Sequence, residues 1–129
     1  MDKLNELTYV EQAENVIKSL QVRNKRGQLQ IPLTTSKIRN LLSMISEIYN
    51  LAAHEPNKEL SIELQGRIQY LKMRFVYEAG RERTVKDFVE KANILQYIDE
   101  IGNSREKFLL FCRYMEALVA YHKFYGGRD

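Results

Sequence analysis

Apolar residues recur along this chain at intervals of three and four positions, which is the period of an α-helix and not the alternation of a β-strand. Residues 9–20 show the pattern clearly, with Val10, Ala13 and Ile17 on one side. The 129 residues include only two prolines and six glycines, so long stretches contain no helix breaker. We therefore predict an all-α fold, a compact bundle of about five helices in a single domain that spans residues 1–129.

The expected helices are separated by short connections that contain turn-forming or capping residues. Their approximate ranges are 9–20, 34–55, 57–79, 84–101 and 103–124. Thr34, Thr35 or Ser36 can cap the second helix, and Gly80 can close the third in a left-handed conformation. Residues 21–33, which include a glycine and a proline, are expected to form a basic, flexible loop.

The last expected helix is apolar on more than one side. It opens with Asn103 and Glu106 at the spacing of a capping box. One stripe contains Phe108, Phe111, Cys112, Met115, Leu118 and Val119, and a second contains Leu110, Tyr114, Ala117, Tyr121 and Phe124. Such a helix either lies at the centre of the bundle or uses its second stripe to meet another protein. The sequence leaves both open.

Positive charge is concentrated in one part of the chain. The stretch between Glu14 and Glu47 contains no Asp or Glu and six basic residues: Lys18, Arg23, Lys25, Arg26, Lys37 and Arg39. The chain has 20 Lys and Arg against 17 Asp and Glu, so the residues outside this stretch have 14 against 17, and the net charge of +3 depends on the stretch. Local basicity suits a polyanion such as nucleic acid. A solvated loop that simply lacks acidic residues would have the same composition.

A second basic set falls on the third helix. Arg67, Tyr70, Arg74 and Arg81 share one face, Lys72 flanks it, and Arg83 follows in the turn. Arginines interleaved with tyrosine can contact phosphates and stack on a base or a sugar.

Ordinary helix ion pairs are the alternative for this face. Glu63–Arg67 and Arg74–Glu78 have the right spacing. They would account for Arg67 and Arg74 but would leave Lys72, Arg81 and Arg83 without a partner, apart from Glu82. Lys37 and Arg39 are expected in the first turn of the second helix, where free amide groups add to an anion site.

Residues that could carry catalysis are scarce. His54 and His122 lie in different helices, and neither has a cysteine or carboxylate at metal-binding spacing. Gly27 and Gly66 do not belong to a phosphate-binding loop motif. The one cysteine, Cys112, excludes an internal disulfide, fits a reducing compartment and is expected to be buried. We predict no enzyme activity, no metal and no cofactor.

The chain has no apolar run of the roughly 20 residues that a membrane span needs. Its first residues lack the basic and apolar regions of a signal peptide. We therefore expect a cytoplasmic protein without membrane contact.

Three segments in order resemble a known family. They are Leu-Thr-Thr-Ser-Lys-Ile-Arg-Asn-Leu-Leu at 33–42, Leu-Lys-Met-Arg-Phe-Val-Tyr-Glu-Ala-Gly at 71–80, and Tyr-Met-Glu-Ala-Leu-Val-Ala-Tyr-His-Lys-Phe-Tyr-Gly-Gly at 114–127. Together they resemble the small subunit of the type III-A CRISPR effector, the Csm complex, over nearly the whole chain.

The resemblance implies a non-catalytic helical protein in antiviral defence. Several copies would stack head to tail as an inner filament along the guide RNA and the target RNA, facing a filament of backbone subunits. By the same analogy, catalysis belongs to the backbone subunit and the large signature subunit. The predicted contacts to the RNA backbone, without base reading, are Lys37, Arg39, Arg67, Lys72, Arg74, Arg81 and Arg83.

Two other functions fit parts of the sequence. A free-standing helical DNA-binding protein would use the second and third helices as a helix-turn-helix with a link at 54–57, but Glu59 and Glu63 would then face phosphates. A protein adaptor would instead use the basic face to bind an acidic partner.

Overall fold

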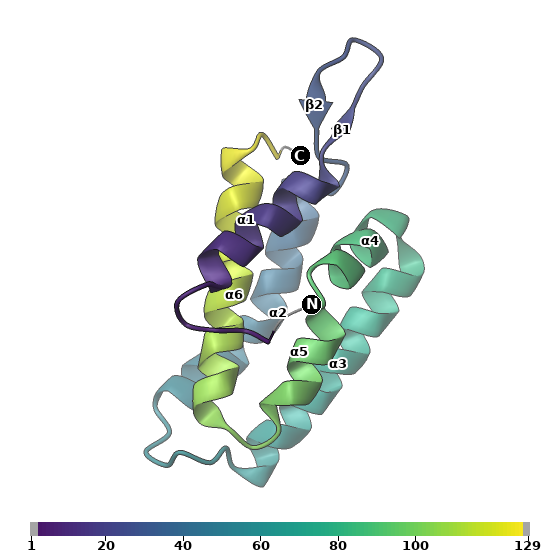
Figure 1. Cartoon of the computed structure of the whole chain (residues 1–129). Helices are drawn as coiled ribbons and strands as arrows, with labels where there is room; N and C mark the ends of the chain where they lie inside the picture. Colours follow the sequence, from purple (N-terminus) through teal and green to yellow (C-terminus); the bar gives the residue numbers. More distant parts are fainter. Residues whose placement is uncertain (1–2, 128–129) are drawn as a thin grey trace.

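Six α-helices and one small hairpin make up the part of the chain that the computed structural model describes, residues 3–127 (Figure 1). The helices are α1 (Tyr9–Leu20), α2 (Thr35–Ala53), α3 (Ile62–Arg81), α4 (Arg83–Lys91), α5 (Ile94–Ile101) and α6 (Arg105–Phe124), and the strands are β1 (Val22–Arg23) and β2 (Leu29–Gln30). The helices pack into one bundle, which confirms the prediction of an all-α fold, with one helix more than expected.

The last helix, α6, packs against three other helices. α1 and α2 pack along it, and α5 packs near its beginning (Figure 1). Phe108, Phe111 and Tyr114 are fully buried, and the Tyr114 hydroxyl donates a hydrogen bond of 2.9 Å to the carbonyl oxygen of Ala92. The second apolar stripe is therefore mostly covered within the chain, and only Phe124, 75% exposed, stands clear of the core. The chain itself thus covers most of the second stripe, but α6 is not buried on every side, because Lys107, Arg113 and Glu116 are exposed.

The start of α3 differs from the prediction because of contacts with a distant part of the chain. The residues before it are extended: the Leu60 amide donates to the Asn103 carbonyl at 2.8 Å, and the Arg105 amide donates to the Lys58 carbonyl at 3.0 Å. Ser61 then caps the helix by accepting from the Leu64 amide. Residues 57–60, expected to be helical, therefore join the α5–α6 turn, and the connection between α2 and α3 is too long for a helix-turn-helix.

The end of the third helix and the length of the fourth also differ from the prediction. Gly80 lies inside α3, which ends at Arg81 with an extended Glu82, so Gly80 does not close the helix. The fourth expected helix is two helices, because Asn93 adopts the left-handed conformation, φ 58°, between α4 and α5. Asparagine tolerates this conformation better than most residues.

The expected loop at 21–33 contains an antiparallel hairpin. β1 and β2 pair with Val22 opposite Gln30 and Arg23 opposite Leu29. Thr34, one of the three predicted candidates, caps α2 by accepting from the Lys37 amide. The cap of α6 is Ser104, which accepts from the Lys107 amide, one residue after the expected Asn103.

Candidate nucleic-acid interface

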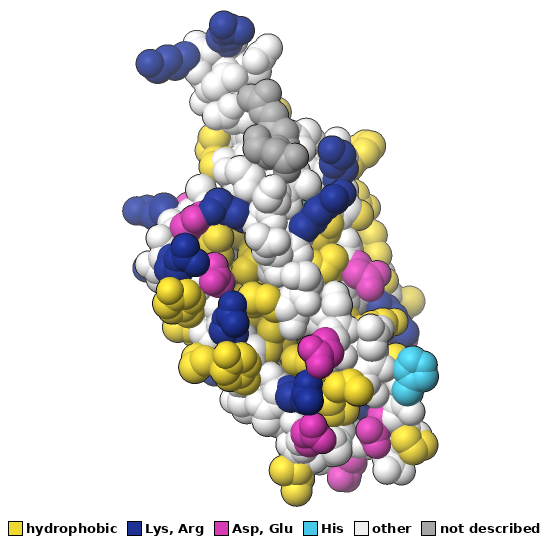
Figure 2. Space-filling view, turned by 180° about the vertical axis from the view of Figure 1, so that it is seen from behind, with side chains coloured by type: hydrophobic (Ala, Val, Ile, Leu, Met, Phe, Trp, Pro, Cys, Tyr) yellow, Lys and Arg dark blue, Asp and Glu magenta, His cyan; other side chains and the backbone are white. Residues whose placement is uncertain are grey.

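The outward face of α3 carries alternating arginine and tyrosine side chains. Arg67, Tyr70, Arg74, Tyr77 and Arg81 follow at intervals of three and four, so they form a row along one side of the helix. Leu64, Ile68, Leu71 and Phe75 face the core on the other side. We call the row the Arg–Tyr ladder. Figure 2 shows Lys and Arg next to hydrophobic side chains on the side of the molecule where α3 lies, the left of that view.

A groove between α2 and α3 brings three of the predicted residues together. Arg67, Tyr70 and Arg74 line it, and Met44 and Ile48 of α2 are among its apolar walls. Its volume is about 490 Å³. These three residues therefore lie on one surface, as their spacing along the helix predicted.

Arg67 is balanced by two carboxylates. Its Nη1 lies 3.2 Å from Glu47 Oε1 and its Nη2 lies 3.2 Å from Glu63 Oε1. These hydrogen bonds, first to Glu63 and then to Glu47, raise the pKa of the Arg67 guanidinium. Arg67 is therefore held in position in the groove, but its charge is compensated.

Arg74 is free of such compensation. In the described chain it is exposed and has no ion-pair partner, so the pair with Glu78 that was the alternative to RNA binding does not form. Glu78 instead lies 3.6 Å from Arg81, whose guanidinium is also 5.7 Å from the centre of the Tyr77 ring.

Three other predicted residues are paired. Lys72 Nζ lies 2.6 Å from Asp99 of α5, Arg83 Nε lies 3.7 Å from Asp87, and Lys37 forms an ion pair with Glu82. The expectation that Lys72, Arg81 and Arg83 lack partners is therefore wrong. Partly exposed ion pairs are worth only about 0–1 kcal/mol, so a phosphate could replace the carboxylate at modest cost.

Arg39 lies on the exposed side of α2, just beyond the first turn. It has no ion-pair partner among residues 3–127, and it does not line the α2–α3 groove. Of the seven predicted residues, Arg39 and Arg74 thus present uncompensated charge, while the other five share theirs with a carboxylate.

The structure adds Tyr77 to the predicted contact residues, and it places two residues of the basic stretch that were not among those contacts. Tyr77, 59% exposed, follows Tyr70 by two helical turns, a spacing that could have identified it. Lys25 and Arg26 lie at the tip of the β1–β2 hairpin, whose formation no periodic pattern indicated.

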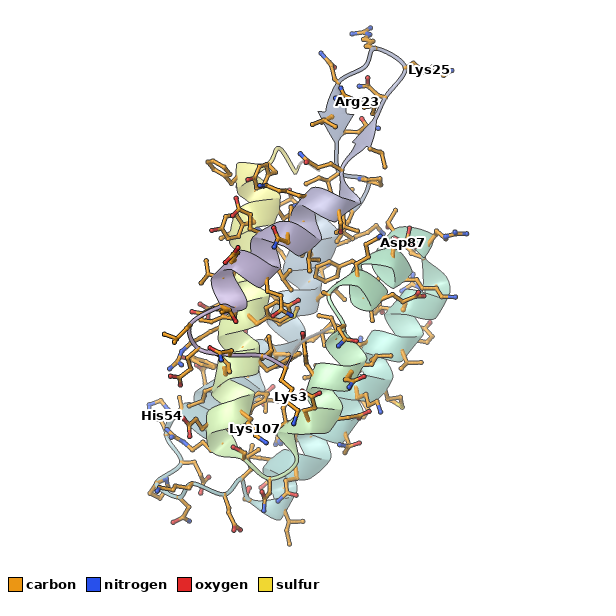
Figure 3. The ribbon with its side chains drawn as sticks, viewed as in Figure 1. Lys3, Arg23, Lys25, His54, Asp87 and Lys107 are labelled. Atoms are coloured by element: carbon orange, nitrogen blue, oxygen red, sulfur yellow. The ribbon has the colours of Figure 1, made fainter. Side chains whose placement is uncertain are left out.

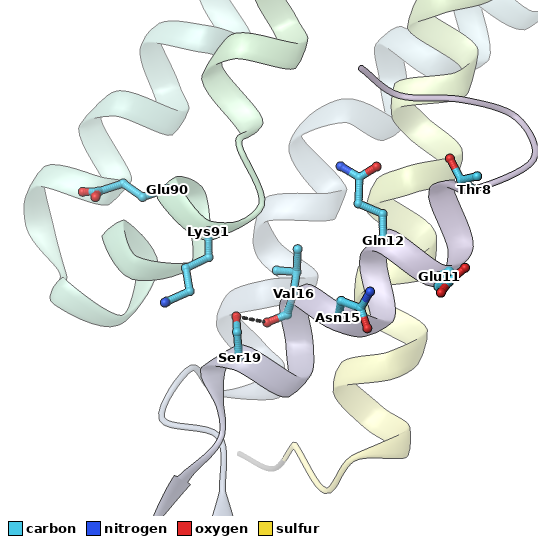
Figure 4. Close-up of a pocket in the computed structure, with 8 residues that line it drawn as sticks. All are labelled: Thr8, Glu11, Gln12, Asn15, Val16, Ser19, Glu90 and Lys91. Atoms are coloured by element: carbon cyan, nitrogen blue, oxygen red, sulfur yellow. Dashed lines mark hydrogen bonds between the residues drawn. The ribbon is translucent and has the colours of Figure 1, made fainter. Parts of the chain in front are cut away.

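The other sites in the structure are less suited to binding an anion. A groove between α1 and α4 (Figure 4) has a volume of about 670 Å³, but Glu11 and Glu90 outweigh Lys91 on its walls. No group of His, Cys, Asp and Glu within residues 3–127 could hold a metal ion. No helix in this same range is long and apolar enough to cross a membrane.

Comparison with known proteins identifies the family. The Csm2 type III-A family model matches residues 8–128. The "CRISPR system Cms protein Csm2" of Streptococcus thermophilus is 48% identical over 126 residues, which are 98% of each chain. The protein of that name from Mycobacterium tuberculosis is 45% identical over 94% of each chain, and that of Enterococcus italicus is 40% identical over 84% of this chain and 81% of its own. The chain thus belongs to the Csm2 type III-A family.

Proposed function

We propose that this protein is a non-catalytic small subunit of a type III-A CRISPR effector complex in antiviral defence. In this role several copies stack in the complex and bind the backbone of the guide RNA and the target RNA. The observation that carries the assignment is the family match over nearly the whole chain, with relatives named as CRISPR system proteins. The detailed RNA contacts rest on the geometry of α3 and on the exposed Arg39 of α2.

The Arg–Tyr ladder supports an RNA-binding role. Guanidinium groups bind phosphate oxygens with charge-assisted hydrogen bonds, and exposed tyrosine rings can stack on bases or sugars. Tyr70 and Tyr77 are each 59% exposed, and Arg74 lies between them without a carboxylate partner. A complex that uses many guides must leave sequence recognition to base pairing, so contacts of this kind need only charge and shape.

The residues with catalytic potential support a non-enzymatic role. His54 is exposed at the end of α2, and His122 is buried in α6 against the Leu33 carbonyl. Cys112 is 2% exposed, and burial raises the pKa of its thiol to about 12, so it is a poor nucleophile.

Exposed apolar side chains support association with other protein chains. α6 keeps little free apolar surface, but α3 exposes Ile62, Met73 and Val76, at 87%, 53% and 50%. They lie beside the Arg–Tyr ladder on the same helix, so α3 could meet RNA and protein at once.

The first experiment is to co-express the tagged chain with its neighbouring genes and to identify the proteins and RNA that purify with it. We expect backbone and signature subunits together with short guide RNAs. Purification of the chain alone, or with DNA and no partner proteins, would overturn the assignment.

The second experiment tests the RNA contacts in the assembled complex. Arg39→Ala, Arg67→Ala and Arg74→Ala together should weaken binding of a target RNA about 10-fold or more. They should lower the slope of log K against log salt by about 2 for each copy that contacts the RNA, because each lost phosphate contact contributes about 0.7. The matched control replaces Lys58, Lys107 and Arg113 by Ala, three exposed cations that lie outside α3 and do not line the α2–α3 groove, and should bind normally. Unchanged affinity and slope in the first variant would refute the RNA-contact assignment.

A further inference from the structure

The β1–β2 hairpin projects from the bundle beyond the end where α2 begins (Figure 1). Arg23 and Lys25 lie on this projection, away from the helices (Figure 3). Lys25 and Arg26 are exposed and have no ion-pair partner in the described chain. No acidic residue occurs between Glu14 and Glu47, so nothing within the hairpin compensates their charge.

The tip of the hairpin is a defined turn. The Asn24 side-chain oxygen accepts from the amides of Arg26 at 2.9 Å and Gln28 at 3.0 Å. The Gly27 amide donates to the Asn24 carbonyl at 3.0 Å, and Gly27 adopts φ +78°. Arg23 Nη1 donates to the Gly27 carbonyl at 2.6 Å, which ties one strand to the turn. The backbone that carries Lys25 and Arg26 is therefore ordered before any ligand binds, so less backbone entropy is lost on binding.

The base of the hairpin is fixed to the bundle. Ile31 and Leu33 are buried, and His122 Nε2 lies 2.6 Å from the Leu33 carbonyl oxygen. The chain then enters α2, where Arg39 also lacks a carboxylate partner. The hairpin thus extends the exposed positive charge of α2 outward from the body of the protein.

We propose that the β1–β2 hairpin is a separate RNA contact, in which Lys25 and Arg26 bind phosphate groups that the α3 ladder does not reach. This inference rests on the proposed function, because it concerns the same RNA. The ligand is the sugar-phosphate backbone, because the hairpin presents two cations without a carboxylate partner in the described chain and has no aromatic ring that could stack on a base. An acidic protein surface could also bind these two cations, and the experiment below distinguishes it from RNA.

The test compares variants in the purified complex with a fluorescent RNA complementary to the guide. Lys25→Ala with Arg26→Ala keeps the backbone hydrogen bonds of the turn. It should leave the number of copies in the complex unchanged and lower the salt slope by about 1.4 for each copy that contacts the RNA, at about 0.7 per phosphate. Lys25→Arg with Arg26→Lys should bind normally, because the charge is kept. Lys58→Ala with Lys107→Ala is the matched control.

The outcomes separate this inference from the proposed function. Normal RNA binding by the hairpin variant, together with weak binding by the Arg39, Arg67 and Arg74 variant, would overturn the hairpin contact and leave the proposed function intact. Loss of copies from the complex in the hairpin variant would mean that the tip binds protein and would also overturn it. A photo-crosslinking amino acid in place of Lys25 should attach to RNA; attachment to protein alone would contradict the inference.

Discussion

Cys112 illustrates how burial sets the chemistry of single side chains in α6. Its thiol is 2% exposed, and desolvation raises its pKa from 9.0 to about 12. Tyr114, two residues further on, is also buried, and desolvation raises the pKa of its hydroxyl. Both groups are thus kept in their neutral forms, which suits a residue that packs and not one that reacts.

Stability should therefore fall at alkaline pH. The folded chain holds the Cys112 proton more tightly than the unfolded chain, so this contribution is complete below pH 9.0 and is lost as the pH rises toward about 12. At pH 10 the loss amounts to about 1 kcal/mol for this group. Urea unfolding at pH 8 and pH 10 measures it, and the pH dependence should be smaller in Cys112→Ala. Rapid reaction of Cys112 with a thiol reagent in the folded chain at pH 8 would contradict this account.

Among the elements, the helices marked by an apolar period or a capping residue in their own sequence were predicted well. α1 has its expected bounds, Tyr9–Leu20, and α2 is capped by one of the three expected residues, Thr34. The start of α3 was misplaced because residues 58–60 pair with the α5–α6 turn, about 45 residues later. Gly80 was interpreted as a helix end because glycine often has that role, but the helix continues past it.

Gly80 is therefore a site where alanine should stabilise the protein. Its position is helical and open, with no atom within 4 Å of an added Cβ. Gly80→Ala should raise the free energy of unfolding by about 0.5–1 kcal/mol, because alanine loses less conformational freedom in a helix. Gly27→Ala is the matched control: it is equally open, but its φ of +78° strains an L-residue, and it should lower stability by about 1 kcal/mol. Urea unfolding of the two variants should move in opposite directions, and equal shifts would disprove the distinction.

At the scale of the whole molecule, the candidate site was only partly predictable. Helical spacing placed Arg67, Tyr70 and Arg74 on one surface, because three- and four-residue intervals fix a face of a helix. It could not show that Lys72 pairs with Asp99 or that Lys37 pairs with Glu82, since these partners are 27 and 45 residues away. The position of the uncompensated charge at the hairpin tip could not be predicted either, because it depends on a turn that leaves no periodic pattern in the sequence.

One contact joins distant parts of the chain at the base of the hairpin. His122, 1% exposed, is 89 residues from Leu33, to whose carbonyl its Nε2 donates. A carbonyl can only accept, so the proton lies on Nε2. The ring also fills its site closely, because a Cβ on Gly127 would collide with it.

Removal of this ring should destabilise the entire fold. His122→Ala leaves a cavity and an unpaired buried carbonyl, and we expect a loss of about 2–4 kcal/mol in the free energy of unfolding. His54→Ala, at the exposed histidine, is the control and should change it by less than about 0.5 kcal/mol. Chemical denaturation followed by circular dichroism gives both values. Similar small effects in the two variants would show that the contact does not hold the bundle together.

The packing of α1 and α2 on the last helix has a consequence for biosynthesis. The ribosome makes α1 and α2 before the helix on which both of them pack. Until α6 leaves the exit tunnel, α1 and α2 lack the helix on which they mainly pack, so part of their apolar surface stays accessible to chaperones. Copies interrupted before α6 could not fold, and only completed chains would be available for assembly.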